Sequence, residues 1–279
     1  MPGQSESVPH PRVGSLSRSL AAALIVFLIA GAASYGLVRQ SEQQRISDQR
    51  GRLADQADDH AHLIQRNIER ALSATYALAG LVQQGGGKID NFEATAIGML
   101  PYYPGAASLQ LAPDGVIRQI VPLAGNEKAI GHNLLADPTR NKEAFLARDT
   151  GRLTLAGPFE LMQGGLGAVG RLPIFLDGGP GQHVFWGFTT VLIRFPEVLD
   201  DARLHQQAEQ GFSYELSRIH PDSGVKQIIA ATPTALIDPV ERAIQMPNGQ
   251  WTLSMSPVNG WATHPACGSR LAWACCSAC

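Results

Sequence analysis

A glycine-rich segment has the spacing of a dinucleotide-binding loop. Residues 165–170 (GLGAVG) match the pattern G-x-G-x-x-G. That chemistry needs a helix opening at the glycines, whose N-terminus receives the pyrophosphate, and an acidic residue about twenty positions further on. Here Arg171-Leu172-Pro173 follows at once and favours a strand, and no acidic residue stands at the required distance. The segment therefore predicts a glycine-rich hairpin rather than a nucleotide site.

Other residues capable of catalysis are scattered along the chain. The sequence contains no H-E-x-x-H, G-x-S-x-G or G-K-[ST] motif. His132, His183 and His220 fall on different predicted elements, and nothing positions Asp149 with Glu160 as a carboxylate pair. We therefore expect no enzymatic activity, no cofactor and no metal in the body of the chain.

All four cysteines lie between residues 267 and 279. Cys275 and Cys276 are adjacent, whereas a tetrahedral metal site usually takes ligands from separated pairs. The Ala, Cys, Arg, Ser and Trp mixture of residues 262–279 instead indicates a translated frameshift, so we expect this tail not to be native coding sequence. The cysteine-free remainder suits an oxidising compartment.

An uncharged apolar segment near the start predicts a membrane anchor. Residues 20–38 are just long enough, at ~1.5 Å per residue, to cross a hydrocarbon core of ~30 Å. A cleaved signal peptide is the alternative, because Ala30-Gly31-Ala32 resembles a cleavage site. We expect residues 1–19 to form a cytoplasmic tail, although arginines flank both ends and the positive-inside count opposes this orientation. The formal net charge of −2, with both signs interspersed, predicts no nucleic-acid partner.

A long amphipathic helix is predicted from Gln40 to about Val82, where the glycines of residues 85–87 end it. Apolar or small residues recur at spacings of 3, 4 and 7 along one stripe. The stripe can pack on its own domain or form a seam between two chains. We expect both: a dimerising stalk over residues 39–74, and core in the Ala/Leu-rich second half. Its members are Ile46, Leu53, Ala57, Ala61, Ile64, Ile68, Leu72, Thr75, Ala79 and Val82.

Three hairpins are predicted after this helix. The first two join Ser108–Leu111 to Val116–Ile120 and, about a hundred residues later, Phe212–Leu216 to Val225–Ile229, each through a turn rich in Pro, Asp and Gly. Their similarity indicates two related α+β subdomains stacked on the long helix. The third hairpin turns at the Asn-Gly pair of residues 248–249.

The remaining segments give two short helices and three strands. Helices are predicted at Phe92–Leu100 and Asn141–Arg148. Strands are predicted at Leu153–Leu155, Leu172–Leu176 and Val184–Ile193. The last of these is nearly unbroken apolar sequence, which is typical of a central strand covered on both faces.

Residues 75–261 resemble the CHASE domain, the extracellular module of bacterial membrane-bound histidine kinases and diguanylate cyclases and of plant cytokinin receptors. The order and spacing of several stretches carry the resemblance. These stretches are LQLAPDGVIRQIV (109–121), GNEKAIGHNLLAD (125–137), ARDTGRLTLAGPFEL (147–161), GGLGAVGRLPIF (164–175), FWGF (185–188), DPVER (238–242) and PNGQWTLSMSPVNGW (247–261).

The resemblance implies an α+β fold: one transmembrane helix, a long stalk helix and two PAS-like α/β subdomains. In the plant receptors an Asp and a Leu contact the adenine-type ligand, and by register these positions are Asn133 and Leu155 here. Asn carries no charge, so cytokinin recognition does not follow. The resemblance yields five candidate ligand-binding residues: Asn133, Leu155, Phe159, Gln163 and Arg171.

The function that the resemblance implies is sensing by a receptor in the bacterial inner membrane. We expect the sensor domain in the periplasm, an unknown small-molecule ligand, and a homodimer through the stalk. Family members continue after the Gly-Trp pair at residues 260–261 with a second membrane helix and an output module, so the chain resembles a receptor truncated after its sensor. An anchored or secreted periplasmic small-molecule-binding protein without a signalling role is the alternative.

Overall fold

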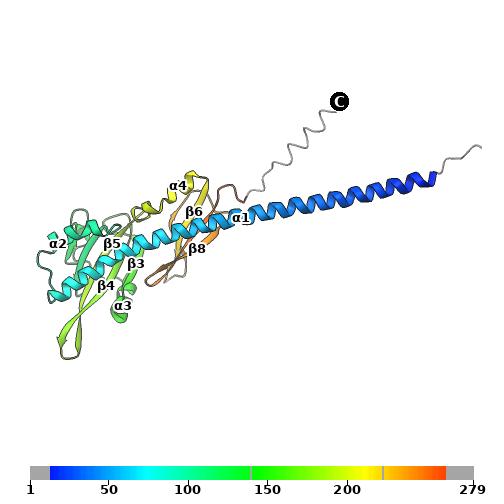
Figure 1. The fold of residues 1–279 in the computed structure, drawn as a ribbon. Helices are drawn as coiled ribbons and strands as arrows, with labels where there is room; N and C mark the ends of the chain where they lie inside the picture. The colour runs from blue at the N-terminus through cyan, green and yellow to red at the C-terminus, as the bar shows by residue number, and fades with distance from the viewer. Residues whose placement is uncertain (1–12, 139, 222, 262–279) are drawn as a thin grey trace, which may run out of the picture. The chain divides into compact units, whose positions relative to one another are not determined.

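The computed structural model describes residues 13–138, 140–221 and 223–261 (Figure 1). The predicted cytoplasmic tail up to residue 12 and the cysteine tail, residues 262–279, lie outside these ranges. The chain divides into two compact units, and the second of them, Arg52–Trp261, contains both sheets.

The first element is one continuous helix, α1 (Val13–Gln84). Within the described part of the chain, its apolar portion is the only helix segment long and apolar enough to cross a membrane. The helix ends where the glycines predict, because the N–H of Gly87 bonds to the carbonyl of Val82 at 2.8 Å. Gly86 and Gly87 adopt φ values of 59° and 98°, which side chains other than glycine rarely accept.

The apolar stripe of α1 is confirmed as core from Leu53 to Val82. Every predicted member in this range is buried, whereas Ile46 is only partly buried. These side chains join one hydrophobic cluster with residues from both sheets. From Leu53 onwards, therefore, the stripe packs against other parts of the same chain.

The first sheet has five antiparallel strands in the order β2-β1-β5-β4-β3. Alternate side chains of β4 and β5 face α1, for example Leu172 and Val191, which belong to its cluster. As predicted, the apolar strand β5 is central. The strands are β1 (Ser108–Pro113), β2 (Gln119–Val121), β3 (Thr154–Glu160), β4 (Leu166–Gly179) and β5 (Gln182–Phe195).

The second sheet has four antiparallel strands in the order β7-β6-β9-β8. Its buried face, which includes Leu216, Ile244 and Leu253, also belongs to the α1 cluster. The strands are β6 (Phe212–Ile219), β7 (Lys226–Ala231), β8 (Val240–Met246) and β9 (Gly249–Pro257).

The predicted internal repeat is confirmed by the strand orders. Replacing β1, β2, β4 and β5 by β6, β7, β8 and β9 converts the order β2-β1-β5-β4 into β7-β6-β9-β8. The strand β3 is the addition that distinguishes the first sheet. Two sheets of the same topology therefore share one helix, as in PAS-like sensor domains.

Short helices join the strands. The predicted helices are confirmed as α2 and α3, and α2 buries Phe92 and Ala96 in the α1 cluster. The helices are α2 (Phe92–Met99), α3 (Lys142–Thr150) and α4 (Leu204–Glu209), with 3₁₀ helices at Leu100–Tyr102, Glu127–Ala129 and Glu197–Ala202.

Most strand boundaries differ by a few residues from those predicted, and two of the differences have a clear cause. β2 begins at Gln119 rather than at Val116, because the backbone of Ile117 donates to His132 and accepts from Gly131, and Val116 lies opposite Asn133 in an isolated bridge. β4 begins at Leu166, because the glycine-rich segment pairs with both β3 and β5. This segment is thus part of a hairpin, as predicted, and its turn is closed by the N–H of Leu161 bonding to the carbonyl of Gly165 at 2.9 Å.

Gly170 lets α1 approach the first sheet. A Cβ built on Gly170 would overlap the side chain of Leu72 on α1 and lie 2.9 Å from Cγ1 of Val191 on β5. Both neighbours are buried, so neither can move aside freely. The glycine motif thus serves helix–sheet packing.

Substitution of Gly170 tests this contact. We expect Gly170→Ala to lower the free energy of unfolding by about 1–3 kcal/mol, because the added methyl overpacks the interface. Gly80→Ala is the control, since Gly80 lies on the exposed side of α1 with no atom within 4 Å of a built Cβ, and a gain of about 0.5–1 kcal/mol is expected there. Urea unfolding followed by circular dichroism measures both, and an unchanged Gly170→Ala variant would contradict the close packing.

Candidate functional site

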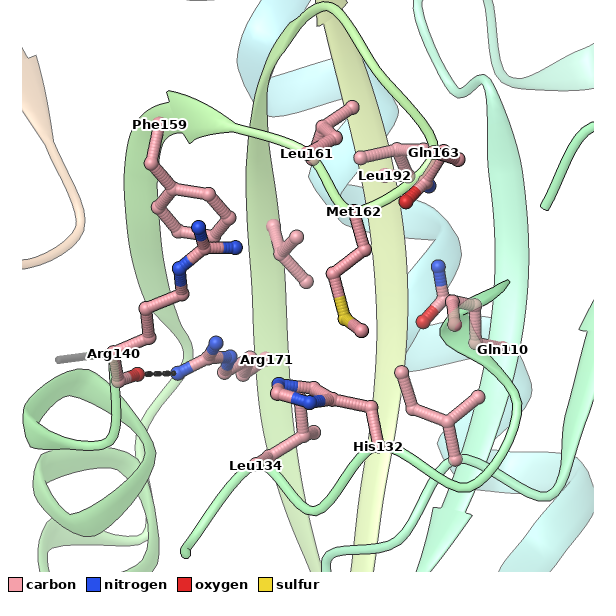
Figure 2. A pocket seen from close by; sticks show the side chains of 13 residues that line it. Gln110, His132, Leu134, Arg140, Phe159, Leu161, Met162, Gln163, Arg171 and Leu192 are labelled. Atoms are coloured by element: carbon pink, nitrogen blue, oxygen red, sulfur yellow. Dashed lines mark hydrogen bonds between the residues drawn. The ribbon is translucent and has the colours of Figure 1, made fainter. Parts of the chain in front are cut away.

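A small pocket lies on the face of the first sheet opposite α1 (Figure 2). Its floor follows from strand alternation: Val169 and Arg171 of β4 point to the pocket, whereas Gly170 and Leu172 between and beside them point to α1. The lining residues are Gln110, Ile117, Ala129, His132, Leu134, Arg140, Phe159, Leu161, Met162, Gln163, Val169, Arg171 and Leu192.

Two loops form the walls of this pocket. The β3–β4 turn contributes Leu161, Met162 and Gln163, and the segment before α3 contributes His132 and Leu134. The second loop is fixed to the first hairpin, because the N–H of Leu134 bonds to the carbonyl of Gly115 at 2.8 Å. The first hairpin and the glycine-rich hairpin together hold the pocket walls.

Met162 lies across the mouth of the pocket. Figure 2 shows its thioether reaching from the β3–β4 turn toward His132, between Arg140 on one side and Gln110 on the other. The residue is 49 % exposed, so it lies at the mouth rather than in the core. The remaining cavity is about 40 Å³, well below the ~300–1,000 Å³ of common ligand sites. A larger ligand must therefore displace this flexible side chain.

Arg171 is the most unusual residue of the site. Its side chain is among the largest that are fully buried, with a relative exposure of 1 %. Nη1 donates to the carbonyl oxygen of Arg140 at 2.8 Å, but Nε has no hydrogen-bond partner among the described residues. Burial lowers the pKa of Arg171 to about 10, an effect that the charges of Glu143 and Asp137 partly offset.

A second arginine lies at the mouth of the pocket. The guanidinium carbon of Arg140 lies 4.5 Å from the centroid of the Phe159 ring, which is the geometry of a cation–π contact. Arg140 Nε also lies 4.0 Å from an oxygen of Asp137. These contacts hold a positive charge beside an aromatic wall.

The amides of the site are already engaged. Gln110 donates from Nε2 to the hydroxyl of Ser108 at 3.1 Å, and its Oε1 accepts from Thr190 at 3.0 Å. Gln163 donates to Oδ1 of Asn126 at 3.0 Å, which ties the β3–β4 turn to the segment after β2. Among the buried side-chain atoms of the described lining residues, the one without a hydrogen-bond partner is Nε of Arg171.

His132 is held toward its neutral form. Its pKa is lowered first by burial and further by Arg171 and Arg140, whereas the carboxylate of Asp137 raises it. A neutral imidazole can accept as well as donate a hydrogen bond. This places a polar group beside the two arginines without adding a third charge at neutral pH.

Phe159, Gln163 and Arg171, three of the five residues expected from the sequence, lie together in the pocket. Asn133 does not line it, and its Oδ1 accepts the N–H of Leu135 at 2.9 Å in a local turn. Leu155 is buried toward α1 and lines a separate cavity of about 50 Å³ between the sheets.

Ten of the thirteen lining residues are not among those expected, and four of the ten carry a polar group or a flexible thioether: Gln110, His132, Arg140 and Met162. Gln110 carried a signal, because it is a polar residue inside an otherwise apolar strand. His132 is one of several scattered histidines, and its place in the sequence does not distinguish it from the others. Arg140 and Met162 lie in loops, where their type and spacing gave no indication of a shared site.

The pKa of His132 provides a test of the site's electrostatics. We expect Asp137→Asn to lower the pKa of His132 further, because the substitution removes the charge that raises it. Asp90→Asn, at an exposed position before α2, should leave it unchanged. NMR titration of ¹³Cε1-labelled histidine, with His132→Gln for assignment, measures the change. A higher pKa in Asp137→Asn would refute this arrangement of charges.

Solved structures with the same fold include two receptor domains. The extracellular ligand binding receptor from Desulfohalobium retbaense DSM5692 matches with a TM-score of 0.56 at 13% identity, covering 72% of this chain and 39% of that chain, so this chain spans well under half of that receptor. The ligand binding domain of the amino acid chemoreceptor PctC of Pseudomonas aeruginosa PAO1, in complex with GABA, matches with a TM-score of 0.52 at 16% identity, covering 74% and 98%. Such likeness establishes the fold alone.

A family model gives the more specific result. No curated protein matches the chain. The model of the CHASE domain matches residues 88–227, half of the 279-residue chain, from the end of α1 to the second strand of the four-stranded sheet. This confirms the resemblance found in the sequence. The chain therefore belongs to the CHASE domain family, and it carries a sensory ligand-binding domain.

Proposed function

We propose that this chain is the sensing part of a bacterial membrane receptor, and that it binds a small molecule in the pocket of the five-stranded sheet. The observation that carries the proposal is a pocket with a buried, incompletely hydrogen-bonded arginine in a sensory domain. Solvent-inaccessible polar groups without partners are costly, and a ligand that supplies the partner removes that cost. Phe159, Gln163 and Arg171 are the expected residues that the proposal retains.

The same proposal includes a location and an anchor. The apolar portion of α1, with the uncharged residues 20–38, would lie in the inner membrane, and Arg52–Trp261 would face the periplasm. Support comes from the CHASE family match and from the extracellular origin of a receptor with the same fold. An output module, of the kinase or cyclase type, would receive the signal.

The proposed receptor is a homodimer, with its seam in the first part of the stalk. Because the stripe from Leu53 onwards is covered within the chain, the free part of the stripe lies before this residue, around Ile46. Ligand binding would then shift an equilibrium between two arrangements of this seam.

The pocket proposal is tested by filling it. We expect at least one compound from a panel of small amines, organic acids, amino acids and purines to raise the Tm of the full chain in detergent. A ligand at 100 times its Kd stabilises by about 2.7 kcal/mol. Met162→Trp should abolish this shift, because the indole occupies the mouth of the pocket. Leu146→Trp, on the exposed surface of α3, is the matched control and should respond as the wild type does. An equal shift in Met162→Trp would place the site elsewhere.

The dimer proposal is tested by disulfide crosslinking. In a chain whose natural cysteines are replaced by serine, we expect Ile46→Cys to form covalent dimers in membranes under mild oxidation. Gln44→Cys is the control, since two residues place it about 200° around the helix from Ile46. Equal crosslinking at both positions, or none at Ile46→Cys, would contradict a seam at Ile46.

A further inference from the structure

The charged groups that line the pocket have one sign. Arg140 and Arg171 are its charged lining residues, and no acidic side chain of the described residues lines it. Asp137 and Glu143 lie close enough to influence Arg171, but neither makes an ion pair with it within 4.0 Å in the described part of the chain. The two guanidinium groups therefore line one pocket. Among the described residues, Asp137 lies 4.0 Å from Arg140 Nε, and no carboxylate forms an ion pair with Arg171.

The hydrogen bonds of Arg171 are incomplete. A guanidinium has five N–H donors in a fixed planar arrangement. Here one donor position bonds to a backbone carbonyl of Arg140, and Nε remains without a partner among the described residues. A buried cation is ordinarily paired with an anion. The geometry that completes such a group is a planar pair of acceptor oxygens.

Apart from Gln110, His132 and Gln163, the rest of the pocket lining is apolar. Branched and aromatic side chains line it beside the arginines, from β1–β2, β3, β4 and β5. An inorganic oxyanion would have to exchange its hydration shell for these surfaces, whereas the hydrocarbon part of an organic molecule gains from contact with them. The apolar lining residues are Ile117, Ala129, Leu134, Phe159, Leu161, Met162, Val169 and Leu192.

From this arrangement we propose that the pocket binds a small organic acid, whose carboxylate contacts Arg171 and Arg140 and whose hydrocarbon part displaces Met162. The proposal names the ligand class of the sensing function proposed above, and it depends on that function. Arg171 supplies the donor without a partner, and Arg140 moves from the Phe159 ring toward the carboxylate. No covalent step is involved.

His132 provides an internal reporter of this binding. In the empty pocket, burial, Arg171 and Arg140 lower its pKa, and Asp137 is the charge that opposes them. A bound carboxylate adds a second negative charge near the ring, so the pKa of His132 must rise on binding. Protonation of His132 in turn strengthens carboxylate binding, so affinity should increase as the pH falls through the pKa of the complex.

The experiment compares butyrate with butyramide on the full chain in detergent, in a buffer free of carboxylates. The two probes have the same size and differ in the charge of the head group. We expect butyrate to raise the Tm in a saturable manner, and butyramide to bind roughly ten- to a hundredfold more weakly, because it lacks the charge-assisted hydrogen bonds. Arg171→Met and Arg140→Gln should each lose most of the butyrate response. Arg148→Gln, a partly exposed arginine on α3 outside the pocket, should keep it.

A second measurement covers the case in which Arg171→Met does not fold. The His132 resonance of wild-type protein should titrate at a higher pH with butyrate present, and Arg140→Gln should reduce this change. If butyramide matches butyrate, or if His132 titrates at the same pH with and without butyrate, the carboxylate assignment is overturned. If inorganic phosphate stabilises the chain through Arg171 and butyrate does not, the site binds an inorganic oxyanion, and the organic-acid assignment is overturned.

These outcomes separate the ligand class from the function. A neutral compound whose stabilising effect is abolished in Met162→Trp, together with no response to butyrate, would leave the sensing function standing and remove the organic acid. If every compound that stabilises the wild type also stabilises Met162→Trp, both the pocket function and the organic-acid assignment are overturned. A butyrate response that depends on Arg171, Arg140 and Met162 supports both.

Discussion

The burial of one helix stripe against two sheets is the constraint on which the rest of the structure depends. The largest hydrophobic cluster requires α1, because Leu216 in one sheet and Leu172 in the other belong to the same buried cluster as Ile64 and Ile68 of the helix. The first sheet adds two smaller clusters that contain no residue of α1. The stripe repeats at helical spacing over the full contact length, so both subdomains must follow the direction of α1. Where the first sheet comes closest, a side chain at Gly170 is excluded. The other face of that sheet is then available for a pocket.

Much of this architecture could be predicted from the sequence because it rests on local patterns. The stripe, the helix-ending glycines and the three hairpins each follow from spacing or turn chemistry within a few residues. The pocket could not be predicted in the same way. Leu155 and Phe159 lie four residues apart on β3, and strict alternation would place them on one face. The register shift between Ala156 and Phe159 sends them to opposite faces, with Leu155 toward α1 and Phe159 toward the pocket. Arg140 and Met162 meet Arg171 only through tertiary structure.

The strand β3 connects the pocket to the second sheet. It carries Phe159, and its backbone is bonded to the other subdomain at two points. The N–H of Leu155 donates to Oδ1 of Asn248 at 2.7 Å, and the carbonyl of Pro158 accepts from Nε2 of Gln227 at 2.8 Å. Asn248 lies in the turn between β8 and β9, and Arg242 of β8 pairs with Asp58 of α1 at 2.7 Å. A displacement of β3 by a ligand would therefore act directly on the sheet that contacts the first buried turns of α1.

A sensor needs a difference in free energy between its empty and occupied states, because a ligand shifts a conformational equilibrium only by its differential affinity. Burying Arg171 without a full set of hydrogen-bond partners costs free energy. In a protein that does not need the charge, replacing a buried charged residue such as Arg171 by well-packed apolar residues often leaves the stability unchanged or raises it. A ligand that pairs with the guanidinium removes a cost rather than adding one more contact. That cost depends on how β3 and β4 are arranged around Arg171. In the proposed receptor, the ligand would therefore favour the arrangement whose free energy it lowers most. In the proposed receptor, the buried arginine would thus link recognition to a change of state in a single residue.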